Sequence, residues 1–141
     1  MSKNINRHKK MAYALLRITI GVIFLTFGAT KLFVTGLDNF AGYMAVQFEG
    51  LIPAVLLTPF SYLLPFLEII LGLFLIVGFM SFWTMTATGA LIAVLVFGAI
   101  MDSNPATVAN NMLYGIVISF LIWNLKINTW SIDYKLGRTY E

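Results

Sequence analysis

Residues 11–33, MAYALLRITIGVIFLTFGATKLF, decide the fold class of this chain. The stretch is long enough to cross a bilayer, which needs about 20 predominantly apolar residues, yet it contains Arg17 and Lys31. At about 100° per residue, Gly21, Gly28 and Lys31 all fall within about 40° of Arg17 on a helix. A charge at mid-membrane costs at least about 2.5–3.5 kcal/mol. We therefore predict that this face points into the protein, where the glycines let another backbone approach; the alternative is snorkelling of both cations with plain helix packing.

The composition places the rest of the chain in the membrane as well. Of 141 residues, 60% are hydrophobic and only 11% are charged, which lies outside the range of soluble globular proteins. Three further apolar runs, at residues 62–80, 82–101 and 109–125, are long enough to span. The sequence predicts one all-α membrane domain over residues 1–141, folded as an antiparallel four-helix bundle.

Basic residues predict the orientation of this bundle. The leader, residues 1–10, and the tail, residues 126–141, carry all but two of the Lys and Arg residues, and those two are Arg17 and Lys31. An excess of Lys and Arg marks the cytoplasmic side of a membrane protein. We therefore predict four spans with both termini cytoplasmic.

The long connection at residues 34–60 is too apolar for a solvated loop. We predict a short extracytoplasmic helix over residues 38–49 with Asp38 as its N-cap. Residues 51–60, interrupted by Pro53 and Pro59, are expected to lie in the interface or to dip back among the helices. The segment is either a flap over the outer end of the bundle or simple interfacial packing.

Several classes of function are excluded by residue types. The sequence has no cysteine, so a dithiol centre and a thiolate metal site are impossible in this chain. His8, the one histidine, lies in the polar leader, and neither a nucleotide-binding nor a metal-binding motif is present. No metal site and no self-contained redox centre are predicted, and no catalytic residue is identified. The net charge of +3 reflects topology signals and does not indicate nucleic-acid binding.

Buried charges in the outer half of the bundle form the candidate site. Helical side chains lean toward the helix N-terminus, so Lys31 in the first span and Glu68 in the second lean toward each other, and Asp102 at the end of the third leans inward. We predict a polar cluster of these three residues, joined by Asn110 or Asn111. The cluster is either a ligand or proton site, or a structural pair of Lys31 and Glu68 that makes each charge tolerable; a third alternative is that they do not pair.

A second pair is predicted on the cytoplasmic side. Arg17 has no acid in the inner halves of the spans, and its candidate partner is Asp133 in the tail.

With these residues placed, the chain resembles the DoxX family of small four-helix bacterial membrane proteins, including the DoxD-like subunits. The matching motifs are Arg17, Gly21, Gly28 and Lys31 in the first span, the loop GLIP at residues 50–53, Glu68, Gly72 and Gly78 in the second span, and the tail WSID at residues 130–133. The resemblance covers residues 12–134. One departure is the KINT segment at residues 126–129, where the family often has Gly and Arg.

The resemblance implies a membrane subunit associated with redox complexes in the bacterial inner membrane. The first hypothesis is an accessory subunit of a quinone-linked redox system, in which Lys31 and Glu68 position a quinone-like or small anionic ligand. Gly21, Gly28 and Gly72 are expected to serve helix packing. The second hypothesis is a non-enzymatic assembly factor or adaptor that binds another membrane protein. A quinone is the candidate cofactor, and a protein partner or a second copy of the chain is expected in the bilayer.

Overall fold

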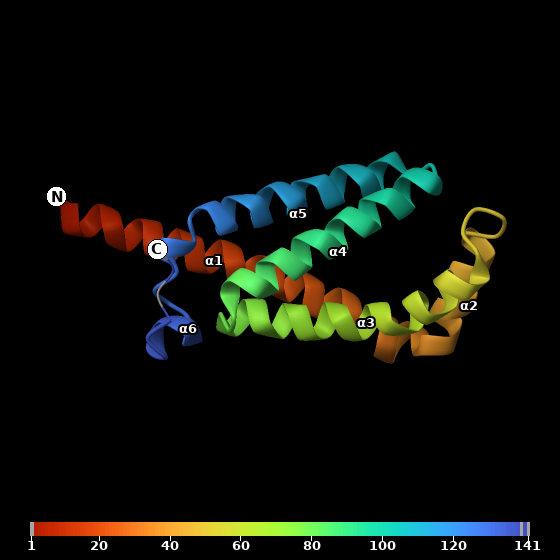
Figure 1. Ribbon diagram of the computed structural model, residues 1–141, viewed down its shortest axis with the longest axis horizontal. Coiled ribbons are helices and arrows are strands. Elements are labelled where there is room, and N and C mark those ends of the chain that lie inside the picture. Colours follow the sequence, from red (N-terminus) through yellow and green to blue (C-terminus); the bar gives the residue numbers. More distant parts are fainter. Residues whose placement is uncertain (1, 139, 141) are drawn as a thin grey trace.

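The computed structural model describes residues 2–138 and 140, and this part of the chain contains helices and no strand (Figure 1). In chain order the elements are α1 (Ser2–Ala29), the π-helical turn η1 (Thr30–Gly36), α2 (Leu37–Gln47), α3 (Ala54–Val77), α4 (Ser81–Met101), α5 (Pro105–Trp123), the 3₁₀ turn η2 (Leu125–Ile127) and α6 (Ile132–Lys135). Four helical segments are long and apolar enough to cross a membrane: Asn6–Gln47, α3, α4 and α5. The prediction of an all-helical chain with four such segments is confirmed.

The first helical segment is longer than residues 11–33. Residues 2–20 contain neither Gly nor Pro, and helix α1 accordingly includes the basic leader. At its other end α1 passes through η1 directly into α2. Gly36, at a φ of 84°, occupies the N-cap position of α2, so the prediction of Asp38 as the N-cap is wrong. The Asp38 carboxylate instead accepts a 2.9 Å hydrogen bond from the Tyr62 hydroxyl.

Helix α3 begins at Ala54, so most of residues 51–60, expected to lie in the interface or to dip back among the helices, belongs to a helix long enough to cross a membrane. Pro53 is the N-cap of α3, and Pro59 and Pro65 lie inside the helix. Prolines are tolerated inside membrane helices where neighbouring helices and Ser or Thr hydroxyls satisfy the backbone groups that they leave free. Pro59 and Pro65 leave the Val55 and Ser61 carbonyls without their i+4 amide donors, whereas the Ser61 hydroxyl donates to a different carbonyl, that of Leu57, at 2.8 Å.

The turn before α5 is fixed by a local capping signal. The Asn104 side chain accepts a hydrogen bond from the Thr107 amide at 3.1 Å, and Pro105 occupies the first helical position. Asn is a favoured N-cap and Pro is favoured immediately after it. Helix α5 therefore starts four residues before the predicted span at 109–125.

The long helices associate as two pairs. Helix α1 packs most extensively against α3, and α4 against α5, whereas contacts between the two pairs are sparse. Figure 1 shows the beginning of α1 and the short helix α6 at one end of the molecule, and α2 at the opposite end. We call these the tail end and the α2 end.

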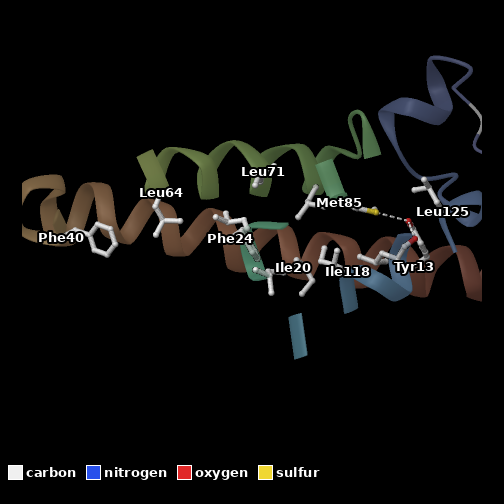
Figure 2. Close-up of a cluster of buried hydrophobic side chains, with 13 residues drawn as sticks. Tyr13, Ile20, Phe24, Phe40, Leu64, Leu71, Met85, Ile118 and Leu125 are labelled. Atoms are coloured by element: carbon white, nitrogen blue, oxygen red, sulfur yellow. Dashed lines mark hydrogen bonds between the residues drawn. The ribbon is translucent and has the colours of Figure 1, made fainter. Parts of the chain in front are cut away.

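The two pairs share an apolar core that extends from Phe40 of α2 to Tyr13 and Leu125 near the tail end (Figure 2). Met85 of α4 and Leu121 of α5 are completely buried, and Leu75 of α3 is 1% exposed. The Tyr13 hydroxyl of α1 donates to the Leu121 carbonyl at 2.9 Å, so the one polar atom that this aromatic ring brings into the core has a partner. Most of the buried side chains of α5 lie in its second half, which leaves its first half free to line a cavity.

Candidate functional site

Lys31 and Glu68 form an ion pair between η1 and α3. The Lys31 ammonium donates to both carboxylate oxygens of Glu68, at 2.6 and 2.7 Å. The Glu68 side chain is 1% exposed and that of Lys31 is 23% exposed. The Lys31 ammonium also lies over two aromatic rings. Its nitrogen is 5.9 Å from the ring centroid of Phe27 and 5.4 Å from that of Phe40, within the range of a cation–π interaction. One cation thus satisfies both oxygens of a buried carboxylate.

Glycines bring the two helices close enough for this pair. A methyl group on Gly28 of α1 would lie 2.5 Å from the Pro65 carbonyl oxygen, and one on Gly72 of α3 would lie 2.5 Å from the Leu25 amide nitrogen. A methyl group on Gly21 would lie 2.9 Å from the Gly72 carbonyl oxygen. All three contacts are with backbone atoms, so a side chain at these positions requires the helices to separate. The glycines predicted to serve helix packing lie at the α1–α3 interface.

The remaining members of the predicted polar cluster lie elsewhere. Within the described residues, Asp102 forms no ion pair with Lys31, and the cavity that Asp102 lines includes neither Lys31 nor Glu68. Asn111 lines the same cavity as Asp102, whereas Asn110 is exposed and outside its lining. The expectation of a single cluster is therefore wrong. Its physical reason is that Asp102 belongs to the α4–α5 pair, which makes few contacts with α1 and α3.

The α2-end cavity, with a volume of about 430 Å³, lies between α2, α3, α4 and α5. Its walls are mostly apolar side chains, including Met44, Phe48, Phe60 and Leu95. Polar groups line it where α4 ends and α5 begins, namely Asp102, Asn104, Thr107 and Asn111, and α2 adds Tyr43 and Gln47. A concave apolar space of this size with a few polar groups is typical of a small-molecule site.

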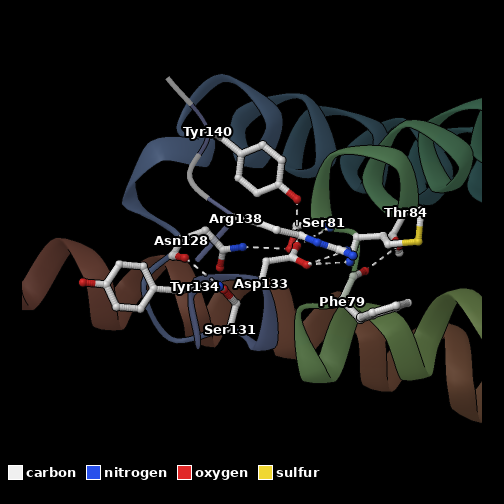
Figure 3. Close-up of polar contacts among 10 residues, drawn as sticks. Phe79, Ser81, Thr84, Asn128, Ser131, Asp133, Tyr134, Arg138 and Tyr140 are labelled. Atoms are coloured by element: carbon white, nitrogen blue, oxygen red, sulfur yellow. Dashed lines mark hydrogen bonds and ion pairs between the residues drawn. The ribbon is translucent and has the colours of Figure 1, made fainter. Parts of the chain in front are cut away.

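A polar network at the tail end holds Arg17 (Figure 3 shows its tail residues). Arg17 is 1% exposed and donates to the Asn128 side-chain oxygen, and to the Trp130 carbonyl at 2.7 Å. Gly78 makes room for it, since a methyl group there would collide with the guanidinium. Of the five guanidinium donors, the Arg17 Nε–H finds no partner in the part of the chain that the structure describes.

Asp133 is a helix cap that comes from a distant part of the chain. Its carboxylate is fully buried and accepts hydrogen bonds from the Met80 and Ser81 amides, at 2.9 and 2.6 Å, where α4 begins. The Tyr140 hydroxyl also donates to it at 2.8 Å, and the Arg138 guanidinium lies 3.7 Å away. A carboxylate at a helix N-terminus satisfies free amides and opposes the positive end of the helix dipole.

These hydrogen bonds set the pKa of Asp133. Burial alone would raise it, but the bonds from Ser81, Tyr140 and Met80 outweigh burial and hold the pKa of this carboxyl below its usual value. Burial, followed by the hydrogen bond to Asp133, raises the pKa of Tyr140.

The expected pair of Arg17 with Asp133 is not a direct one. No ion pair joins them among residues 2–138 and 140; the Asn128 side chain, bound to Arg17, donates to the Ser81 hydroxyl at 2.8 Å, and the Ser81 amide binds Asp133. Sequence reasoning missed Asn128, Ser81 and Gly78 as members of this network. The polar KINT segment in the tail was a visible signal for Asn128 alone, and Gly78 was named only as a motif glycine.

The comparisons with known proteins place the chain in a family. A family model described as methylamine utilisation protein MauE matches residues 9–104. The chain belongs to the MauE family. The resemblance to the DoxX family is therefore wrong: its motifs are small residues and single charges that membrane helices of different families share. No curated protein and no solved structure matches the chain.

The MauE match contains both partners of the ion pair, helix α1 from residue 9 onward, and helices α2 to α4. Asn111, Asn128 and Asp133 lie beyond the matched residues. Within the described residues, no group of three or more His, Asp or Glu side chains is arranged to hold a metal ion.

Proposed function

We propose that this MauE-family chain is an integral-membrane accessory protein of the redox system that serves methylamine utilisation. The observation that carries the proposal is the MauE match over residues 9–104. The matched residues contain α3, α4 and all but the first three residues of Asn6–Gln47, which are three of the four helical segments long enough to span a membrane. The 141 residues include no cysteine. Thiol chemistry, where the system needs it, must therefore come from another protein.

The proposed arrangement is an antiparallel four-helix bundle in the bacterial inner membrane, with both termini cytoplasmic and α2 outside. Arg7, Lys9 and Lys10 near the start of α1, and Lys126, Lys135 and Arg138 in the tail, support this orientation through the positive-inside rule. The charge of Lys31, the cation nearest α2, is balanced by Glu68.

The absence of cysteine makes the orientation directly measurable. Single cysteines at Gly50, in the turn after α2, and at Leu136, after α6, are to be labelled in intact cells with a membrane-impermeant maleimide. We expect labelling at position 50 only, and labelling at both positions after the cells are permeabilised. Labelling at position 136 in intact cells would show that the orientation is opposite to the proposed one.

Within this function, Lys31 and Glu68 serve as a structural pair. To bind a ligand, the Lys31 ammonium would have to leave Glu68. The Glu68 carboxylate, which is 1% exposed, would then be a buried charge without a partner, which is energetically costly. A small anion is therefore a poor ligand here. The α2-end cavity is a better site for a quinone-like ligand than the Lys31–Glu68 pair.

The proposed function is tested by deleting the gene from its bacterium. We expect the deletion strain to lose growth on methylamine while it grows normally on succinate, and plasmid-borne wild-type protein to restore growth. Unchanged growth on methylamine would contradict the proposal.

A second candidate is a membrane adaptor without a small ligand. It is favoured by helix α5, in which only 11% of the most apolar stretch is buried, against 33–39% for the other three segments. The exposed apolar side chains of α5 include Leu113, Ile116, Phe120 and Trp123. Cross-linking from Ile116→Cys to a stoichiometric membrane protein in cells would support this candidate, and cross-linking to lipid alone would contradict it.

A further inference from the structure

The α2-end cavity combines an apolar body with a polar end. The body is formed by side chains of α2, α3 and α4 such as Met44, Leu57, Phe60 and Leu95, and the polar end by Asp102 and Asn111. Two polar side chains of α2, Tyr43 and Gln47, also line the cavity. A molecule that fills about 430 Å³ here contacts apolar groups over most of its surface. An amphipathic molecule matches that division.

Asn111 provides the observation that points to a ligand. It is 9% exposed, and within residues 2–138 and 140 its side chain makes no hydrogen bond, although it lines the cavity. The Asn111 amide atoms reach the open space of the cavity, since neither of them is among the fully buried polar atoms without a partner. Asn104, by contrast, is occupied as the N-cap of α5. An oxygen of a bound molecule would satisfy the Asn111 amide N–H groups.

The rim of the cavity indicates the route by which such a molecule arrives. Leu56 of α3 and Phe97 of α4 line the cavity and are 62% and 60% exposed. Both lie on helices long and apolar enough to cross a membrane, and in a bilayer their exposed side chains would face the surrounding lipid. A molecule dissolved in the bilayer can therefore enter sideways between α3 and α4.

We propose that the α2-end cavity binds one amphipathic molecule from the bilayer, with its apolar body between α3 and α4 and an oxygen-bearing head group hydrogen-bonded to Asn111. The ligand class is a carbonyl-bearing head on an apolar chain, which a quinone and a phospholipid ester share. This inference deepens the proposed function. The site itself is defined by the cavity and Asn111, and only its role in the cell rests on the proposed function.

The test uses purified full-length protein in detergent and two probes, the short-chain quinone ubiquinone-1 and dihexanoyl phosphatidylethanolamine, with binding followed by calorimetry. Gly98→Leu fills the cavity: a Cβ at Gly98 would lie 3.8 Å from the Phe48 ring, an ordinary contact, and the remaining side-chain atoms would occupy the cavity. Asn111→Leu keeps a similar size and removes the amide. Gly42→Leu on α2 is the matched control, since nothing lies within 4 Å of its added Cβ and Gly42 is outside the cavity lining.

We expect one equivalent of probe to bind wild type and Gly42→Leu equally. Binding should weaken at least tenfold in Gly98→Leu and about fivefold in Asn111→Leu, the latter matching one hydrogen bond of about 1 kcal/mol. Preference for ubiquinone-1 with this pattern assigns the site to a quinone, and the same pattern with the phospholipid alone assigns it to lipid. Absence of binding, or binding equally strong in Gly98→Leu with an unchanged unfolding temperature, overturns the inference.

Growth separates this inference from the proposed function. If the deletion strain fails on methylamine but neither probe binds wild type, the function stands and the cavity site is overturned. If the probes bind with the expected pattern and the deletion strain grows normally on methylamine, the site stands and the function is overturned.

Discussion

The ammonium of Lys31 binds both carboxylate oxygens of Glu68, at 2.6 and 2.7 Å, across the interface of η1 and α3. Each charge alone is expensive in an apolar interior, and together they satisfy each other. The pair also joins the first helical segment to α3 at one defined position, because a shift of either helix by one residue would move the charged groups apart. It is accordingly better suited to fixing helix register than to binding a ligand.

Removal of one partner of this pair should destabilise the protein. We expect Lys31→Met to lower the free energy of unfolding by roughly 3 kcal/mol, the lower end of the range for a broken buried pair, because Lys31 is 23% exposed. The double variant Lys31→Met/Glu68→Met should recover most of the loss, since no uncompensated charge remains. Unfolding of the detergent-solubilised protein measures both values.

Lys126→Met, at an exposed lysine, is the control for this experiment and should change stability by less than about 0.5 kcal/mol. A double variant as unstable as the sum of the two single variants would show that the two charges do not interact.

The glycines between α1 and α3 should tolerate no side chain. We expect Gly28→Ala and Gly72→Ala each to cost about 1–3 kcal/mol, since their added methyl groups would lie 2.5 Å from backbone atoms of the facing helix. Gly42→Ala in α2, where nothing lies within 4 Å, should be neutral or stabilising by up to about 1 kcal/mol. Thermal unfolding of the three variants in one detergent checks this order, and equal effects at all three sites would refute close packing of α1 on α3.

Asp133 should stabilise the protein in a pH-dependent way. Asp133→Asn removes the charge that caps α4 and should cost about 1–3 kcal/mol at pH 7. The folded-state pKa of Asp133 is lowered, so its contribution is fully present above the unfolded pKa, about 3.9, and is lost as the pH falls through the folded value. The stability difference between wild type and Asp133→Asn should therefore shrink below about pH 4.

Glu49→Gln, at an exposed carboxylate, is the matched control and should show a difference near zero at every pH. If the difference for Asp133→Asn stays constant between pH 7 and pH 3, the capping role of the carboxylate is excluded.

Exchange of the charges of Arg17 and Asp133 should not restore stability. Among the residues that the structure describes, hydrogen bonds connect the two side chains through Asn128 and Ser81, and each has its own partners. We expect Arg17→Glu/Asp133→Arg to be no more stable than either single variant, because an arginine at position 133 cannot accept from the Met80 and Ser81 amides. A double variant clearly more stable than both singles would establish a direct pair.

The site residues differ in how far the sequence could place them. Lys31 and Glu68 were predictable as a pair because Glu68 is the one charge in its apolar run, Lys31 lies near the outer end of the first run, and the lean of helical side chains brings them together. Asp102 was assigned to the same cluster by the same reasoning, but the lean of a side chain says nothing about how far apart two helix pairs lie. The resemblance to the DoxX family failed for a related reason, since glycines and isolated charges at helical spacing are demanded by membrane packing in general.

By itself, the sequence determined that this protein is helical, that four segments are long and apolar enough to cross a membrane, and that the charges of Arg17 and Glu68 cannot face lipid at mid-membrane. These properties depend on local composition and on the cost of exposing charge or backbone to hydrocarbon. Tertiary structure alone decided that Arg17 binds the tail at Asn128, that Asp133 caps α4 across more than 50 residues, and that the helix pairs leave a cavity at the α2 end. Those outcomes depend on which helices pack closely, and that is settled by the shapes of facing surfaces far apart in the chain.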